Sequence, residues 1–515
     1  MTTLAQWQDM SDDERIALVE RHANPTDILD LISLLASAYP DAGSQVRAAQ
    51  LLARCPSFAP RPCVQPARRV ASYYYQLSGG GIESSLITLT TELGKSRAAF
   101  ILADRIVGSF ATETEETTQA DRIAQDQLVL LETCGDTHAA ALKEALITRE
   151  IDTLIHHAWC DRQLLWDIVL CRVLGVRIVV FVHGAFSHFV DVSDASFEEW
   201  NDGRFFSSIT QALSLADAVI TLSELNRRFF SVFNPQTYTV VHRLSAPYRD
   251  ALTLPRTAPD VPTILWVGRF DPYKHPEDAL EVLAQTRLSI PDAQLLYVGS
   301  GNNDQYQRML EERARELGIS EAVSFAGFHE DVRPYYLSSS VLLETTEVEG
   351  FCLVLAEACA CGLPIVAYEL PNVPFSSCDG ISWVAQNDVA AAARASVKLL
   401  QDATLRDACG RAERSFVGHE LEQAYPTRLT DVLDALESDR APQPATEQDR
   451  ALWTMLLEHY VRGQERAHAA LVAERERARR ADEELARYRD DVQHSPSFRI
   501  GRAVTALPRK ILGRG

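Results

Sequence analysis

The sequence predicts an α/β protein made of two successive parallel-sheet domains. From about residue 69 onward, short apolar segments alternate with segments of helical periodicity. Such alternation favours a parallel sheet covered by helices on both faces. A polar, proline-bearing segment at 254–262 interrupts the pattern, and the same alternation starts again at residue 263. Because open α/β sheets bind ligands at the carboxyl ends of their strands, two such halves predict a ligand site in a central cleft between them.

The first half opens with a strand-like run at 69–75, which glycines 79, 80 and 81 follow. Residues 82–93 then have helical periodicity and end before a glycine, a common helix stop. Further apolar segments of strand length lie at 98–102, 153–156, 178–182, 218–222 and 238–241.

The second half repeats this order of elements. Strands are expected at 263–267, 294–298, 323–325, 341–343 and 364–368. Helices are expected at 276–284, 304–317 and 351–361. The loops that follow the strands are therefore the places to look for functional side chains.

Two flanking regions differ from the α/β halves. Residues 1–66 form an acidic helical pattern that ends in a proline-bearing linker. Residues 450–489, within the C-terminal region 440–515, form a long charged helical pattern whose near-heptad apolar positions are interrupted by Gln464 and Glu474. A coiled coil that makes an oligomer and a solvated single helix both remain open.

The last stretch, 495–515, carries five basic residues and no acidic one, with apolar residues between them. Such a segment can lie on an anionic membrane surface, and a frayed tail is the alternative.

Composition limits the partners and the compartment. The chain has 515 residues, with 50 lysines and arginines against 71 aspartates and glutamates, so the formal charge is −21. That charge argues against nucleic acid as a partner of the whole surface. Ten cysteines include no CxxC pair, which favours buried, reduced thiols. No stretch reaches the roughly 18 apolar residues of a membrane helix, and the N-terminus lacks a secretory pattern, so we expect a cytoplasmic protein.

The strongest chemical signal is a pair of glutamates at the start of an apolar helical segment. Glu349 and Glu357 are seven residues apart within the stretch 349–361. A buried carboxylate such as Glu357 needs hydrogen-bond donors, and a pair of sugar hydroxyls would supply them. The free N–H groups at the beginning of the helix favour an anion such as phosphate. Salt bridges to local arginines are the alternative.

Two glycine-containing loops follow predicted strands. In the first, Gly268 precedes Arg269 and Lys274, which leave the carboxyl edge of the sheet together. An arginine fork suits phosphate oxygens and a lysine adds a point charge, although such residues are also common on plain surfaces. In the second, Gly299 and Gly301 form a turn that lets the backbone approach a ligand.

Together these motifs resemble retaining glycosyltransferases of the GT-B fold, specifically glycosyltransferase family 4. The resemblance covers roughly residues 69 to 435 and is most specific over 263–368. It includes the stretch Gly327-Phe328-His329-Glu330-Asp331-Val332, which resembles the family's segment around the nucleobase. In the first half, Gly79-Gly80-Gly81 looks like the family's glycine-rich loop, and His183 follows a strand as the family's active-site histidine does.

The resemblance implies the GT-B architecture, with two Rossmann-like domains facing a central cleft. Residues 67–258 would be the acceptor-side domain and 259–435 the nucleotide-sugar domain, between the N-terminal extension and the long C-terminal helix. Arg269 and Lys274 would hold the donor diphosphate without a metal or cofactor, and Glu349 and His183 would sit by the donor sugar. The other implied donor-binding residues are Gly80, Gly81, Gly268, Gly299, Gly301, His329, Val332, Gly350, Phe351, Leu353 and Glu357, the last through the ribose hydroxyls.

Two positions depart from the family pattern. His275 stands where a glycine commonly follows the phosphate lysine, and Cys352 replaces a small residue between Phe351 and Leu353. Neither change removes a charge, so we expect activity to survive.

The function expected from the resemblance is transfer of a hexose from a nucleotide-diphosphate sugar to a glycan acceptor. A lipid-linked acceptor in bacterial surface polysaccharide biosynthesis, reached at the inner face of the membrane, would fit the basic tail. A small soluble acceptor, a catalytically silent scaffold in a glycan-assembly complex and a nucleotide-sugar epimerase are the other readings. The charged set Arg269, Lys274, Glu349 and Glu357 favours a transferase.

Overall fold

The computed structural model describes most of the chain up to residue 451. The described residues are 2–59, 66–77, 80–107, 123, 126–132, 137–185, 203–257, 259–301, 304–370, 373–424, 428–437, 446–448 and 451. The chain divides into the units Met1–Trp453 and Thr454–Gly515, and the second lies wholly outside the described residues. The predicted helix at 450–489, apart from Ala451, and the basic tail at 495–515 therefore also lie outside them.

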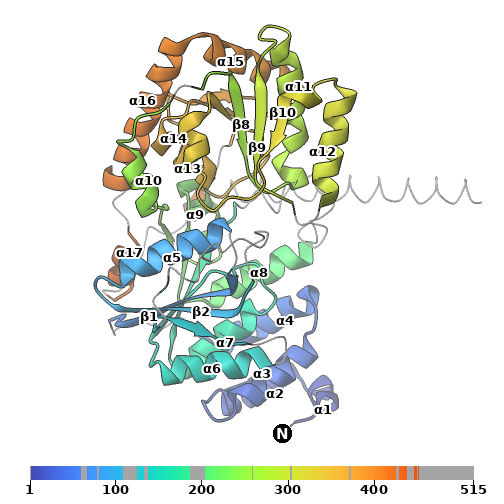
Figure 1. The fold of residues 1–515 in the computed structure, drawn as a ribbon. Coiled ribbons are helices and arrows are strands. Elements are labelled where there is room, and N and C mark those ends of the chain that lie inside the picture. Colours follow the sequence, from blue (N-terminus) through green and yellow to red (C-terminus); the bar gives the residue numbers. More distant parts are fainter. Residues whose placement is uncertain are drawn as a thin grey trace, which may run out of the picture. The chain divides into compact units, whose positions relative to one another are not determined.

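The first α/β half is built on a parallel sheet with seven described strands (Figure 1). Their order is β3-β2-β1-β4-β5-β6-β7, so the strand order reverses between β1 and β4, and a doubly wound fold binds ligands at such a reversal. The strands are β1 (Arg69–Leu77), β2 (Ala98–Ile106), β3 (Leu128–Leu130), β4 (Thr153–His156), β5 (Arg177–Val182), β6 (Ala218–Thr221) and β7 (Thr237–Thr239). The helices are α5 (Gly81–Leu93), α6 (His138–Thr148), α7 (Leu164–Leu174), α8 (Gly203–Leu215), α9 (Glu224–Phe230) and α10 (Ala246–Ala251).

The second half repeats the topology with six described parallel strands in the order β10-β9-β8-β11-β12-β13. The strands are β8 (Thr263–Val267), β9 (Gln294–Val298), β10 (Val323–Phe325), β11 (Val341–Glu344), β12 (Ile365–Tyr368) and β13 (Ser382–Val384). The helices are α11 (Pro276–Arg287), α12 (Asp304–Glu316), α13 (Arg333–Ser338), α14 (Leu353–Cys361), α15 (Val389–Gln401) and α16 (Ala403–His419). The reversal here lies between β8 and β11, the two strands whose loops carry Lys274 and Glu349.

Several inner strands are buried on both faces, which explains why the sequence predicts them as near-continuous apolar runs. All six residues of β5 and all four of β4 are buried. A parallel sheet covered by helices on both sides leaves no solvated face, so alternation of polar and apolar residues is lost. The expected fold class of two Rossmann-like α/β halves is confirmed.

The N-terminal extension is helical, as expected. It consists of α1 (Leu4–Asp9), α2 (Asp12–His22), α3 (Ile28–Ala38) and α4 (Ala42–Ala53). Helix α3 packs against α6 and α7, and α4 packs against α8, so the extension covers one helical layer of the first half (Figure 1). Its core is Trp7, Val19 and Leu35, all almost fully buried.

A last described helix, α17 (Leu429–Glu437), packs against α5 of the first half although it follows the second half in sequence. Among the described residues, no helix combines the length and apolar character needed to cross a membrane. The described cysteines are free thiols, most of them buried, as the spacing predicted.

Candidate active site

Three glycines stack at the carboxyl edge of the second sheet. Gly299 has φ +138°, and a Cβ on it would lie 1.9 Å from the carbonyl oxygen of Gly268. The Gly299 amide donates to the carbonyl of Gly327 at 2.8 Å. The loops after β8, β9 and β10 therefore lie against one another, and a side chain at Gly299 would separate them. Gly301 lies at the end of the same turn, beside the undescribed residues 302–303.

Lys274 and Glu349 form an ion pair across the strand reversal. The Lys274 ammonium contacts the Glu349 carboxylate, and the two side chains are only 15% and 19% exposed. Burial lowers the pKa of Lys274 and is the largest single effect, but Glu349, with smaller contributions from Tyr273, Glu344 and Cys352, more than offsets it and holds that pKa well above its usual range. The sequence left open that Glu349 forms salt bridges with local arginines. The structure shows instead that Glu349 pairs with a lysine.

Arg269 lies in the same loop but has different partners. Its guanidinium pairs with Asp271, and its Nη2 donates to the hydroxyl of Tyr273 at 3.4 Å. The Lys274 ammonium lies 5.5 Å from the centre of the same tyrosine ring. Tyr273 thus lies between the two cations, and Arg269 remains 55% exposed, able to meet a ligand.

The loop that carries Glu349 comes extremely close to the first half. A Cβ on Gly350 would lie 1.9 Å from the carbonyl oxygen of His183, which directly follows β5. Nearby, a Cβ on Gly81, at the start of α5, would lie 3.0 Å from Cδ1 of Leu353. The structure therefore brings together residues that are more than 160 positions apart in sequence. Gly80 precedes α5 as its N-cap residue, and Gly79 lies outside the described residues.

Helix α14 begins at Leu353, two residues later than the predicted start at Phe351. The reason is Cys352, whose φ of 65° and ψ of 79° are left-handed and cannot belong to an α-helix. Phe351 is instead a buried loop residue packed on Phe375. No side chain caps the N-terminus of α14, so the first N–H groups of this helix are free of a side-chain acceptor and suit an anion.

A second carboxyl group, that of Glu344, lies near Lys274 and contacts Cys352, the residue before α14. It ends β11, is buried, and accepts from the amide of Thr346 at 3.1 Å. Burial raises the pKa of Glu344, although nearby Lys274 opposes the shift. The thiol of Cys352 donates to it at 3.8 Å, which fixes the left-handed residue before α14.

Glu357 lies on the second turn of α14 and faces two tyrosines. The hydroxyl of Tyr336 donates to its carboxylate at 3.0 Å. Burial raises the pKa of Glu357 to about 7, while hydrogen bonds from Tyr336 and Tyr248 oppose the shift. The carboxylate therefore has donors from the protein itself, and not from arginines, and it is ready to change protonation near neutral pH.

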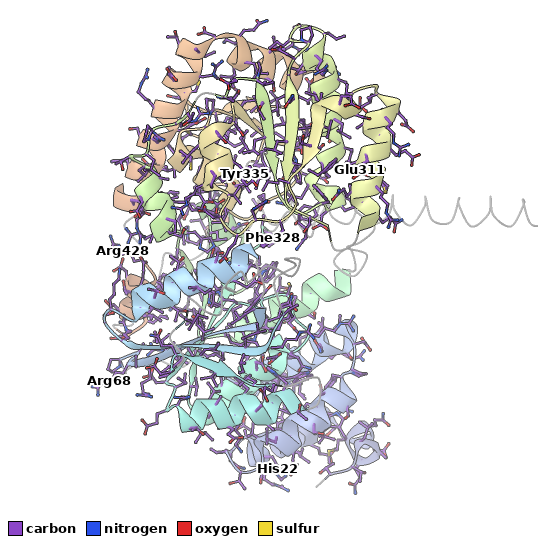
Figure 2. The ribbon with its side chains drawn as sticks, in the orientation of Figure 1. His22, Arg68, Glu311, Phe328, Tyr335 and Arg428 are labelled. Carbon is purple, nitrogen blue, oxygen red and sulfur yellow. The ribbon has the colours of Figure 1, made fainter. Side chains whose placement is uncertain are left out.

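His329 and Val332 lie between β10 and α13. The hydroxyl of Tyr335 is 2.8 Å from Nε2 of His329, and Val332 is the N-cap residue of α13. Figure 2 labels Tyr335 on α13 and Phe328 in the loop before His329. These residues are at the same carboxyl edge as the glycine stack.

His183 points its ring into a stack and not into open solvent. The residue is 8% exposed, and its ring centre lies 4.5 Å from Phe181 and 5.5 Å from His242. Its Nε2 is 2.7 Å from Nδ1 of His157. Burial, with smaller contributions from His157 and His242, lowers the pKa of His183 well below its usual value. His183 is therefore neutral at physiological pH.

Sequence reasoning missed several residues of this corner. Tyr273 and Tyr336 lie within the region that resembles the family, but nothing in their spacing shows which charged group each one contacts. Glu344 follows the predicted strand 341–343 and carries no sequence signal of its own. His157 follows β4 directly, as His183 follows β5, and that shared position at strand ends is the one signal that could have found it.

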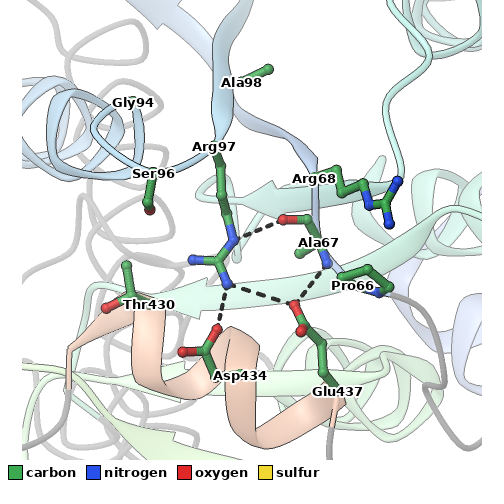
Figure 3. Close-up of a pocket in the computed structure, with 10 residues that line it drawn as sticks. All are labelled: Pro66, Ala67, Arg68, Gly94, Ser96, Arg97, Ala98, Thr430, Asp434 and Glu437. Carbon is green, nitrogen blue, oxygen red and sulfur yellow. Dashed lines mark hydrogen bonds and ion pairs between the residues drawn. The ribbon is translucent and has the colours of Figure 1, made fainter.

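A separate hollow of about 840 Å³ lies at the amino ends of β1 and β2, away from the residues above (Figure 3). Arg97 crosses it, pairing with Asp434 and lying 3.6 Å from Glu437 of α17. The Ala67 amide also donates to Glu437 at 2.8 Å. These charges are used to hold α17 on the first half, so we assign no chemistry to this hollow.

Comparison with known proteins shows a similarity to a family of glycosyl transferases, confined to the second half. Residues 255–416 match the model of the glycosyl transferases group 1 family. A mannosyltransferase from Mycolicibacterium smegmatis, GDP-mannose-dependent and named for its action on phosphatidylinositol monomannoside, is 27% identical over 65% of this chain and 89% of its own length. A D-inositol 3-phosphate glycosyltransferase from a Mycobacterium species is 31% identical over 32% of this chain and 38% of its own.

An uncharacterized glycosyltransferase from Haemophilus influenzae is 31% identical over 30% of this chain and 43% of its own. The chain thus spans less than half the length of several curated relatives that it matches.

Solved structures match over both α/β halves. The Anabaena protein HepE in complex with UDP-glucose has a TM-score of 0.54 at 14% identity, covering 72% of this chain and 97% of its own. Sucrose-phosphate synthase from Thermosynechococcus elongatus has a TM-score of 0.52 at 19% identity, covering 69% and 95%. At these identities the likeness shows the fold, which is the GT-B arrangement expected from the sequence.

Proposed function

We propose that this chain is a retaining glycosyltransferase that moves a hexose from a nucleotide-diphosphate sugar to a glycan hydroxyl. The observation that carries the proposal is the meeting of Lys274, Glu349 and Gly350 with His183. The Lys274 ammonium and the Glu349 carboxylate lie beside the start of α14, which no side chain caps. The backbone of Gly350 approaches His183 closely at the same place. A diphosphate needs cations and N–H donors, and the sugar attached to it needs a neighbouring polar group.

In this proposal, Arg269 and Lys274 bind the donor diphosphate. The bond between the anomeric carbon and the phosphate oxygen breaks, and negative charge grows on the leaving nucleoside diphosphate. Fixed cations in a poorly hydrated corner stabilise such charge without reorganising. We propose that these two side chains do this without a metal ion.

The acceptor oxygen attacks the same face of the sugar, so the anomeric configuration is kept. As the new carbon–oxygen bond forms, the acceptor proton passes to an oxygen of the leaving phosphate. Glu349 lies beside the donor sugar, and Glu357 accepts hydrogen bonds from the ribose hydroxyls. The hydroxyl of Tyr336 already lies 3.0 Å from this carboxylate. A ribose hydroxyl would therefore bind beside the Tyr336 hydroxyl or replace it as the donor.

We further propose a lipid-linked glycan acceptor of bacterial surface polysaccharide synthesis, with the chain at the cytoplasmic side of the membrane. The basic segment 495–515 and the lipid acceptor in the name of the mycobacterial relative support this. Deletion of 495–515 should release the protein from anionic vesicles. Unchanged vesicle binding would remove that support.

The test of the donor site is calorimetric titration with UDP, GDP and dTDP in buffer containing a chelator. Micromolar binding of one of them, lost in Arg269→Ala, is the expected result. The matching nucleotide sugars, supplied with glycan acceptors, would then give a product whose anomeric configuration is read by NMR. Binding of none of the three nucleotides would count against the donor site, and an inverted product would overturn retention.

A further inference from the structure

Three histidines form a buried stack beneath the Gly350 contact. They are His157 after β4, His183 after β5 and His242 after β7. The ring centres of His157 and His183 are 5.0 Å apart, and Phe181 stacks on His157, His183 and His242. Only one pair is joined by a hydrogen bond, that between Nδ1 of His157 and Nε2 of His183 at 2.7 Å. Ring packing and hydrogen bonding can therefore be separated here by mutation.

All three rings are neutral at physiological pH. Burial, with smaller contributions from the neighbouring His156 and His242, lowers the pKa of His157 to about 3. Burial lowers the pKa of His242 to about 3 as well. A neutral imidazole has one N–H and one bare nitrogen, so a hydrogen bond between two of them fixes which ring donates.

The surroundings of His157 decide the direction of that bond. Nε2 of His157 is buried and has no partner among the described residues. If His183 donated, the proton of His157 would be on this Nε2, which leaves a buried N–H unsatisfied. If His157 donates from Nδ1, its Nε2 is bare, and an unsatisfied acceptor is the smaller and commoner defect. The network therefore assigns the proton to Nδ1 of His157.

The same assignment fixes the tautomer of His183. Its Nε2 is then the bare nitrogen that accepts from His157, and its own proton is on Nδ1. That Nδ1 has no hydrogen-bond partner within the described residues. His183 thus presents a neutral N–H donor at the strand end that faces Gly350.

We propose that His157 is a positioning residue that holds His183 as the Nδ1–H tautomer, so that His183 donates a hydrogen bond to a hydroxyl of the donor sugar. The inference rests on the proposed function, which puts the donor sugar beside His183. A neutral donor suits a hydroxyl oxygen, whereas the opposite tautomer would offer only a lone pair.

The end of β4 is anchored in a way that suits this role. The amide of His157 donates to the carbonyl of Tyr73 in β1 at 2.9 Å. The preceding residue, His156, faces away from it and contacts Asp167 of α7 at 2.9 Å. Asp167 in turn is 3.0 Å from His138, so β4 is tied to both α6 and α7. The ring of His157 is therefore carried on a rigid support.

The test reads the tautomer directly in the full chain labelled with ¹⁵N-histidine. Long-range ¹⁵N–¹H NMR distinguishes protonated from bare ring nitrogens, and the His183 signals are assigned by their loss in His183→Asn. We expect Nδ1 of His183 to carry the proton in the wild type. His157→Leu should release that preference, and His157→Asn should keep it, because the asparagine N–H can take the place of Nδ1–H.

His242→Phe is the matched control, because it keeps a ring in the stack but touches no hydrogen bond of His183. We expect its His183 tautomer to match the wild type. In transfer assays, kcat/KM should fall about tenfold in His157→Leu, the size of one net hydrogen bond, and recover in His157→Asn. Circular dichroism and the melting temperature establish that each variant is folded.

A proton on Nε2 of His183 in the wild type would overturn the inference. So would an unchanged His183 tautomer in folded His157→Leu. If the wild type transfers no sugar from any nucleotide donor, the proposed function fails, yet the spectra still decide whether His157 fixes the tautomer of His183.

Discussion

The α-carbon of Gly350 lies so near the carbonyl of His183 that a Cβ attached to it would be 1.9 Å from the carbonyl oxygen. Real Cβ atoms do not come that close to a carbonyl, so the glycine is required by contact between the two α/β halves. The φ of Gly350 is not in the left-handed range, because Gly350 is not among the glycines with positive φ. The constraint is therefore steric and acts on the placement of Glu349 beside it.

We predict that Gly350→Ala abolishes most transfer activity while the fold survives. The added methyl group must push the loop away from His183, at a cost of about 1–3 kcal/mol for overpacking. A displacement of about 1 Å at a catalytic group can cost on the order of 100-fold in rate. The measurement is kcat together with the melting temperature.

Gly318→Ala is the matched control for that experiment. Gly318 has φ +69° but nothing within 4 Å of its Cβ position, and it follows α12, far from His183 in the sequence. Alanine there should cost about 1 kcal/mol of stability from left-handed strain alone. A similar loss of activity in both variants would mean that stability, and not the Gly350 contact, limits the enzyme.

Lys274 and Glu349 should have opposite effects on nucleotide binding. Lys274→Met removes the buried cation and should weaken nucleoside diphosphate binding about 10–100-fold, the range for a charged hydrogen bond of roughly 1.5–3 kcal/mol. Glu349→Gln removes the anion that competes for that cation, so binding should be kept or tightened while turnover falls. Calorimetry and steady-state kinetics on the same samples separate the two.

Equal loss of nucleotide affinity in both variants would contradict this assignment. It would show that the ion pair acts as a structural unit and that the phosphates bind elsewhere. Both variants must keep the wild-type melting profile for the comparison to hold.

The raised pKa of Glu357 predicts that nucleotide binding depends on pH. Its pKa is raised from 4.5 to about 7 by burial, so the carboxyl is largely protonated in the free protein at pH 6. Two ribose hydroxyls donate best to the carboxylate, so binding should release a proton at pH 6 and tighten as the pH rises through 7. Calorimetry in buffers of different ionisation enthalpy counts the protons released.

The same group has a defined effect on stability. Because the folded carboxyl binds its proton more tightly than the unfolded one, its contribution to the free energy of unfolding falls as the pH rises from 4.5 to about 7. Glu357→Gln should flatten both the binding and the stability profile in this window. A wild-type pH profile in that variant would show that another group titrates.

How far the sequence predicts this protein is best seen strand by strand. The expected bounds of β4, β8, β9 and β10 agree with the structure. For β4, which is buried throughout, the reason is that a strand buried on both faces is a continuous apolar run. Burial does not explain β10, an edge strand whose residues are only partly buried or exposed. The three-residue strands β3 and β13 are not predicted. Each is a sheet edge of three residues that are only partly buried or exposed, and a run this short is a weak strand signal even in β3, where all three residues are apolar.

For the site, the sequence predicts which loops carry chemistry but not which atoms meet. Arg269 and Lys274 were expected to act together, yet one pairs with Asp271 and the other with Glu349, 75 residues away. The start of α14 was misplaced because nothing in the letters Phe-Cys-Leu reveals a left-handed Cys352. A contact between positions so far apart depends on which strands become neighbours in the sheet, here β8 and β11, and local periodicity contains no information about that.

Cys352 gives a prediction about backbone strain. Its φ of 65° is tolerated by glycine and poorly by β-branched residues. Cys352→Val should lower the free energy of unfolding by about 1–3 kcal/mol, whereas Cys352→Gly should change it by less than roughly 1 kcal/mol. Denaturant titration of the folded proteins measures both.

Cys359→Val provides the comparison for size. Cys359 is fully buried within α14, the helix that Cys352 precedes, and has helical backbone geometry, so the substitution adds similar volume without left-handed strain. If Cys359→Val destabilises the protein as much as Cys352→Val, the cost comes from packing and not from φ.

Arg243 joins the segment after β7 to two helices that belong to different parts of the chain. Its guanidinium contacts Glu92 of α5 at 2.9 Å and Glu422, after α16, at 2.6 Å, and all three side chains are at most 22% exposed. Glu422 also accepts from the amide of Leu244 at 3.0 Å.

A lysine at position 243 would have the charge but not the two-sided fork that reaches both carboxylates. We therefore expect Arg243→Lys to lose about half the stability lost in Arg243→Met, which itself should cost about 3–5 kcal/mol because two shielded carboxylates lose their partner. Chemical unfolding at two salt concentrations measures this, and equal stability of the wild type and Arg243→Met would show that the three-residue contact contributes nothing to holding the segment in place.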